Sequence, residues 1–131
     1  MQPTFTAEPS HPLTVLEGND ISLQWSYDLA GESFKRVEFI DVTSSPTIQI
    51  VEVDTVGQTP VHLRNNYIGR VQVNVTATHT SITILGANRS VDSKNYEFEV
   101  VLPGGAGLHT LVTILVQCKY NHAKFSFFSI P

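Results

Sequence analysis

The chain has 131 residues, of which 41% are hydrophobic and 15% are charged, and its formal net charge is -4. This length fits one domain with a buried core. The negative charge and the lack of a basic patch argue against nucleic acid and anionic membranes as partners. No apolar run is long enough to span a membrane, and no signal-peptide pattern follows Met1. We therefore expect any membrane attachment to come from a segment outside this chain.

Short β-rich runs separated by turn residues predict an all-β sandwich or barrel. In the clearest run, residues 21–27, apolar residues such as Leu23 and Trp25 occupy alternate positions. This period of two predicts a strand with one buried face. The expected strands are, in chain order, residues 13–16, 21–27, 34–42, 48–53, 61–63, 67–76, 81–85, 96–100 and 108–116.

The two last runs, residues 96–100 and 108–116, also predict which side chains are buried. Residues 96–100 alternate apolar with acidic positions, so Phe98 should point inward and Glu97 and Glu99 outward. Residues 108–116 are almost continuously apolar, which predicts a strand covered on both faces. No stretch has a convincing helical period.

Residues 91–98 read Val-Asp-Ser-Lys-Asn-Tyr-Glu-Phe. This segment resembles the F-strand motif of immunoglobulin domains, Asp-Ser-Gly-x-Tyr-x-Cys. The resemblance makes Tyr96 the tyrosine-corner residue, whose hydroxyl bonds back to the backbone. It also pairs Asp92 with Arg70, which stands where the family has an arginine at the start of strand D. Phe98 takes the place of the F-strand cysteine.

Further segments extend the resemblance over about residues 8 to 117. Residues 17–27 are similar to the A′–B turn and the B strand, with Trp25 at the B-strand cysteine position. Residues 81–84 resemble the E strand, and residues 104–113 resemble the Gly-rich bulge and G strand. The tryptophan of strand C is missing, and Val37 or Phe39 lies near its place.

The resemblance implies an immunoglobulin-like V-set β-sandwich with about nine strands and Greek-key connections. The chain has one cysteine, Cys118, so an intradomain disulfide is excluded. We expect Trp25 and Phe98 to pack between the sheets in its place. The domain should cover residues 1–117, and residues 118–131 should form a tail or a linker to a following domain.

The sequence resembles two groups of invertebrate V-set proteins. The stronger resemblance is to cysteine-free, membrane-distal domains of the allorecognition receptors of colonial hydroids, and it implies that this domain is extracellular and lies at the cell surface. Such a domain would bind protein, most simply another copy of itself on an opposing cell. The weaker similarity, to invertebrate chitin-binding V-domain proteins, implies carbohydrate binding through exposed aromatics, for which Tyr67 and Phe34 are the candidates. No catalytic set is present, so we do not expect an enzyme.

The outer face of strands G, F, C and C′ is a common contact surface in V-set domains. In this chain that face should carry Arg36, Glu38, Gln49, Glu97 and Glu99. Mixed charge of this kind can serve solubility alone. It also suits a self-complementary patch, because a two-fold interface pairs each residue with a different one on the partner.

Other candidate sites are weaker. The five histidines lack metal-ligand spacing, so neither a metal nor a cofactor is expected. Asp41, Glu52 and Asp54 could converge at one end of the sandwich, although solvated loop acids are the simpler account. Cys118 is either a partly exposed chain-end thiol or a bond to another chain or to a following domain.

Two sequons are candidate N-glycosylation sites. They are Asn74-Val75-Thr76 and Asn88-Arg89-Ser90.

Overall fold

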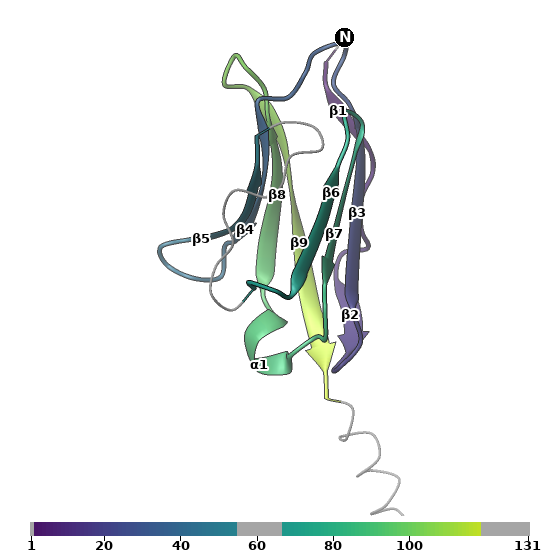
Figure 1. Cartoon of the computed structure of the whole chain (residues 1–131), viewed down its shortest axis with the longest axis vertical. Helices are drawn as coiled ribbons and strands as arrows, with labels where there is room; N and C mark the ends of the chain where they lie inside the picture. The colour runs from purple at the N-terminus through teal and green to yellow at the C-terminus, as the bar shows by residue number, and fades with distance from the viewer. Residues whose placement is uncertain (1, 55–66, 119–131) are drawn as a thin grey trace, which may run out of the picture.

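Two β-sheets pack face to face and enclose one hydrophobic core (Figure 1). The computed structural model describes residues 2–54 and 67–118. The four-stranded sheet has the order β1-β3-β7-β6, and the five-stranded sheet has the order β2-β9-β8-β4-β5. The strands are β1 Thr4–Ala7, β2 Leu13–Leu16, β3 Ile21–Asp28, β4 Arg36–Asp41, β5 Ile48–Val53, β6 Val71–Val75, β7 His79–Ile84, β8 Asn95–Val101 and β9 Gly107–Gln117.

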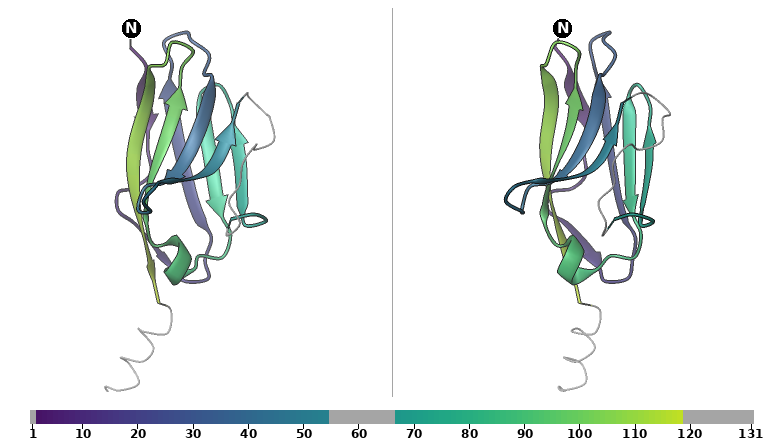
Figure 2. Two further views of the ribbon diagram at one scale, coloured as in Figure 1. Left: turned by 90° about the vertical axis from the view of Figure 1, so that its left-hand side faces the viewer. Right: turned by 60° about the vertical axis from the view of Figure 1, so that its left-hand side comes forward.

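All pairings within the two sheets are antiparallel except that between β2 and β9. Strands that neighbour each other are often distant in the chain, as β3 and β7 or β4 and β8 are. Figure 2 shows the two layers from the side of the five-stranded sheet. The expected all-β sandwich of nine strands is therefore confirmed for the described residues, with Greek-key crossovers between the sheets.

The strands that make up the nine differ from those expected. Strand β1 was not anticipated, and the short strand expected at 61–63 lies outside the described residues. β6 is shorter than the predicted strand at 67–76, because the chain turns before Val71: Arg70 donates its backbone N–H to the carbonyl of Tyr67, and Gly69 has φ +80°.

The prediction that residues 108–116 are covered on both faces is wrong. In β9 the side chains of Val112, Ile114 and Val116 are buried, whereas Leu111 and Leu115 are 56% and 45% exposed. The strand lies in a sheet with one face against the core and one face outward, so its leucines reach the surface.

One short helix was not anticipated from the sequence. Helix α1, Arg89–Asp92, connects β7 to β8 at the end of the sandwich where β9 ends (Figure 1). Asn88 caps it by accepting hydrogen bonds from the backbone N–H groups of Ser90 and Val91. A helix of four residues is too short to leave a periodic apolar pattern in the sequence. Within the described residues, no helix is long and apolar enough to cross a membrane.

Candidate protein-binding face

The outward side of the five-stranded sheet is the largest surface on which predicted site residues gather. We call it the outer face; its members are the strand residues of β2, β9, β8, β4 and β5 that point away from the core. Alternation in the sequence determines this face, because apolar side chains alternate with polar ones and the apolar set is drawn into the core. All five predicted contact residues, Arg36, Glu38, Gln49, Glu97 and Glu99, lie on these strands at half-buried positions.

Strand register brings several of these residues into direct contact. Glu38 on β4 lies opposite Glu99 on β8 and opposite Glu52 on β5. The side-chain amide of Gln49 donates to carboxylates of both Glu38 and Glu52, the latter at 2.9 Å. Arg36 donates from Nε to Oε2 of Glu38 at 3.0 Å. Arg36 is therefore already paired within its own domain.

The outer face carries more negative than positive charge. Its strands hold the carboxylates of Glu38, Glu52, Glu97 and Glu99 but only one guanidinium, that of Arg36. Partial burial raises the pKa of Glu99 above its ordinary value, and the neighbouring carboxylates of Glu38 and Glu97 raise it further. Close carboxylates therefore repel one another on this face.

A histidine that the sequence analysis did not select also belongs to the outer face. His109 on β9 lies opposite Glu99 and places Nδ1 3.5 Å from Oε2 of Glu97. Its imidazole lowers the pKa of Glu99, although less than burial and the two carboxylates raise it. Alternation along β9 from the buried Val112 would have placed His109 outward.

Three exposed leucines lie on the outer face, one of them, Leu111, directly beside the charged residues of β8, and the sequence analysis missed them. Leu111 pairs with Glu97 across β9 and β8, and Leu115 pairs with Thr14 across β9 and β2. Leu16, 46% exposed, lies two residues after Thr14 on the same side of β2. Of the large hydrophobic side chains exposed in the described parts of the chain, only Ile68 lies elsewhere. We call Leu16, Leu111 and Leu115 the leucine strip.

The two residues at the family's cysteine positions are in contact inside the sandwich. The rings of Trp25 and Phe98 stack at 4.2 Å with an interplanar angle of 12°, and both side chains are fully buried. Phe39 packs against Trp25 at 5.9 Å and stacks on Tyr96 at 5.0 Å. Phe39 thus occupies the region that the family gives to its strand C tryptophan.

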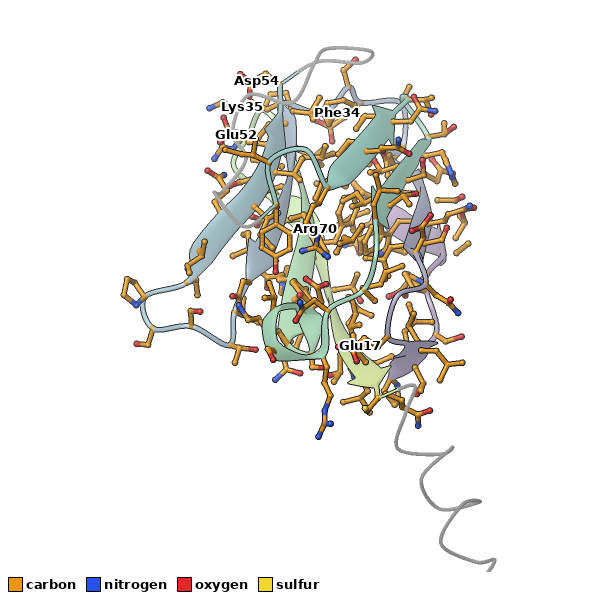
Figure 3. All side chains as sticks on the ribbon, turned by 60° about the horizontal axis from the view of Figure 1, so that its bottom comes forward. Glu17, Phe34, Lys35, Glu52, Asp54 and Arg70 are labelled. Carbon is orange, nitrogen blue, oxygen red and sulfur yellow. The ribbon has the colours of Figure 1, made fainter. Side chains whose placement is uncertain are left out.

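Arg70 and Asp92 meet at the α1 end of the sandwich, where Figure 3 shows Arg70. Nη2 and Nη1 of Arg70 donate to the two carboxylate oxygens of Asp92 at 2.7 and 3.3 Å. Asp92 is fully buried and also accepts the backbone N–H of Asn88 at 2.7 Å. The guanidinium also donates to the carbonyls of Leu85 and Gly86. The pair therefore ties β6 to the β7–β8 connection.

Tyr96 makes the corner contact that the resemblance predicts. Its hydroxyl donates to the carbonyl of Asp92 at 2.8 Å and lies 3.2 Å from the hydroxyl of Tyr67. Since Tyr96 has one hydroxyl proton, Tyr67 must donate in the second bond. Burial raises the pKa of both phenols, so both remain protonated at neutral pH.

The three acids Asp41, Glu52 and Asp54 do not converge at one end of the sandwich. Asp41 pairs with Ile48 at one end of β4 and β5, whereas Val37 pairs with Val53 at the other end. Figure 3 shows Glu52 and Asp54 together at that other end. Asp41 is buried and accepts from Nζ of Lys94 at 3.0 Å. No group of three possible metal ligands occurs in the described part of the chain.

The two sequon asparagines lie away from the outer face. Asn74 is exposed on β6, in the other sheet, and Asn88 is exposed at the start of α1.

The structure is similar to two solved protein chains. It superposes on murine CRIg with a TM-score of 0.70 and 21% identity, covering 89% of this chain and 99% of that one. The second match is a chain from a structure concerning T cell specificity and activation by the bacterial superantigen toxic shock syndrome toxin-1. Its TM-score is 0.69 with 10% identity, covering 88% and 99% of the two chains. No family model and no curated protein sequence matches this chain.

The chain has an immunoglobulin-like V-set fold. With its one cysteine, it has no disulfide between the sheets. Domains with this fold typically bind other molecules and do not catalyse reactions. These identities establish the fold alone, so the ligand has to be inferred from the surface of this chain.

Proposed function

We propose that this domain is an extracellular recognition module of a cell-surface receptor, and that it binds a second copy of itself through the outer face. The observation that carries the proposal is the leucine strip on β9 and β2, which meets the charged residues of the outer face where Leu111 lies opposite Glu97 on β8. Clustered exposed apolar side chains rimmed by polar groups mark protein-binding surfaces. Charged residues at the rim then set register and specificity more than affinity.

Docking between two copies would rest on the leucine strip more than on Arg36. Leu111 and Leu115 offer apolar area that gains free energy when water is removed. Arg36 is already bonded to Glu38, and the surplus of carboxylates on both copies opposes close approach. The affinity of one pair of domains should therefore be low. Many copies on two opposing cells would compensate through avidity.

The two aromatic residues that made carbohydrate binding an alternative are not exposed. It needs aromatic rings exposed on a surface, and the two candidates were Phe34 and Tyr67. These side chains are only 9% and 3% exposed. Protein binding is therefore the function that the described surface favours.

Bead aggregation tests the proposal. Beads coated with the chain should aggregate at high coating density, and Leu111→Asp should abolish this by removing apolar area and adding a charge. Gln72→Asp is the matched control, because Gln72 is exposed on β6 in the other sheet; its beads should aggregate normally. If wild-type beads aggregate at no density or salt concentration, docking between copies is wrong, and a positively charged protein becomes the better partner.

A charge exchange tests whether the charged rim sets specificity. If Arg36 of one copy approaches Glu97 or Glu99 of the other, Arg36→Glu should reduce aggregation of beads that all carry this variant. Mixing them with beads that carry Glu97→Arg or Glu99→Arg should restore part of it. Equal aggregation in every combination would remove these charges from the contact.

A further inference from the structure

Asn74, the first residue of one of the two sequons, lies on the solvent-facing side of strand β6. Asn74 is exposed on β6, between the inward positions of Val73 and Val75, so its side chain points away from the core. The residue opposite Asn74 on the neighbouring strand β7 is Ser81, which is small and half-buried. Among the strands that the structure describes, β6 lies at the edge of its sheet and has β7 as its one neighbour. Space for a bulky group is therefore available around the Asn74 amide.

The Asn74 side chain has no hydrogen-bond partner in the described residues, whereas Asn88 has a structural task. Oδ1 of Asn88 accepts from Ser90 and Val91 at 2.9 and 3.2 Å, and its backbone N–H donates to the buried Asp92. The side chain of Asn88 therefore serves as the N-cap of α1. The side-chain amide of Asn74 makes no comparable hydrogen bond to the described residues, so a glycan on Nδ2 would break none.

We propose that Asn74 carries an N-linked glycan that shields the outward side of the four-stranded sheet. This inference rests on the extracellular location in the proposed function. The side-chain Nδ2 would form a bond to the anomeric carbon of an oligosaccharide carried on a lipid pyrophosphate. The bond from that carbon to the pyrophosphate oxygen breaks, the lipid pyrophosphate leaves, and the amide loses one proton.

The position of this glycan has a consequence for docking. The chain contains two sequons, and neither lies on β2, β9, β8, β4 or β5. A glycan is bulky and hydrated, so the sheet that carries Asn74 would be closed to close protein contact. The outer face would stay bare. Modification at Asn74 and recognition at the outer face are therefore compatible on one domain.

Intact-mass spectrometry tests the site. The full chain is secreted from cultured animal cells behind an added leader, then weighed before and after treatment with an enzyme that removes N-linked glycans. We expect a glycan mass on wild type that Asn74→Gln and Thr76→Ala both lose, whereas Asn88→Gln keeps the glycan on Asn74. Circular dichroism should show that Asn74→Gln folds normally. A glycan mass unchanged by Asn74→Gln, or no glycan on wild type, would overturn the proposal.

The same samples separate this inference from the proposed function. Glycosylated and deglycosylated domains should aggregate beads equally, because Asn74 lies on the sheet opposite the docking surface. If removal of the glycan increases aggregation that Leu111→Asp still abolishes, the glycan reaches the outer face and the claim that it covers only the opposite sheet is wrong. A glycan at Asn74 on a domain that never aggregates would contradict docking between copies and leave the modification site standing.

Discussion

At the scale of single residues, the core shows how two aromatic rings can take the place of a disulfide. A disulfide typically contributes about 2–4 kcal/mol to stability, in the standard view by restricting the unfolded chain. The Trp25–Phe98 stack instead acts in the folded state, through buried apolar area and ring contact. It has one defect: Nε1 of Trp25 is buried without a hydrogen-bond partner in the described residues, which costs about 1–3 kcal/mol.

That defect gives a prediction about two substitutions at one position. Trp25→Ala should lower the free energy of unfolding by about 3–5 kcal/mol, because it leaves a cavity in the core. Trp25→Phe should cost clearly less, since it keeps a ring against Phe98 and removes the unpaired N–H. Urea denaturation of both variants measures the difference. Equal losses would mean that the stacked ring contributes nothing of its own.

The Arg70–Asp92 pair should matter far more than a surface ion pair. Arg70→Met keeps the apolar stem but leaves the buried Asp92 carboxylate without its cation, so we expect a loss of about 3 kcal/mol. Arg89→Met is the matched control; Arg89 is exposed on α1, and its loss should cost less than about 0.5 kcal/mol. Denaturant midpoints compare the two variants. Similar small losses in both would show that the pair behaves as if it were solvated.

At the scale of elements, a second ion pair joins β4 to the segment before β8. Burial alone would raise the pKa of Asp41. Hydrogen bonds from Lys94, the backbone of Thr43 and the side chain of Ser44, together with the Lys94 charge, outweigh burial and lower it. A carboxyl whose pKa is lower in the folded state stabilises the fold above its unfolded pKa. That stability is lost as the pH falls through the folded pKa.

Acid unfolding should therefore depend on Asp41. Below about pH 3.9, the ordinary pKa of aspartate, wild type should lose stability progressively as the Asp41 carboxylate is protonated. Asp41→Asn should be less stable at pH 7 and should lose less between pH 4 and pH 2, because it has no carboxylate to protonate. Thermal melts across this range measure both slopes, with the exposed Glu32→Gln as control. Parallel slopes in wild type and Asp41→Asn would contradict this role.

How far the elements can be predicted from the sequence depends on the contrast between their two faces. β3 alternates strictly between apolar and polar residues, and β8 does so as far as Val100, so their sequences predict the strand and the side that faces the core. β9 has leucines on its outward side as well as leucine, valine and isoleucine on its inward side, so its sequence did not show clearly which side faces water. β1 was missed because its four residues hold one half-buried apolar side chain, Phe5.

The candidate face was predictable in part for the same reason. Alternation on β4 and β8 placed Arg36, Glu38, Glu97 and Glu99 on one side of their strands. The sequence could not reveal that Arg36 bonds to Glu38, because such a contact depends on side-chain conformation. The leucine strip also depends on the pairing of β2 with β9, which joins segments from the two ends of the domain.

At the scale of the whole molecule, like charge on two facing copies predicts an unusual salt dependence. The Debye length falls from about 10 Å at 0.1 M salt to about 3 Å at 1 M, so salt should weaken repulsion between the carboxylates and increase bead aggregation. The double variant Glu97→Gln/Glu99→Gln should aggregate more than wild type at low salt and respond less to added salt. Aggregation that falls with salt would mean that pairs of opposite charge dominate the contact.

The central claim is that the outer face is where two copies meet, and an NMR titration tests it most directly. The ¹⁵N-labelled chain is titrated with unlabelled chain to millimolar concentration, so that weak association becomes visible. We expect the backbone amide signals of β9, β8 and β4 to shift with concentration, with the largest changes around Leu111, while those of β6 and β7 stay constant. Shifts confined to β6 and β7, or no shifts at any concentration, would contradict it.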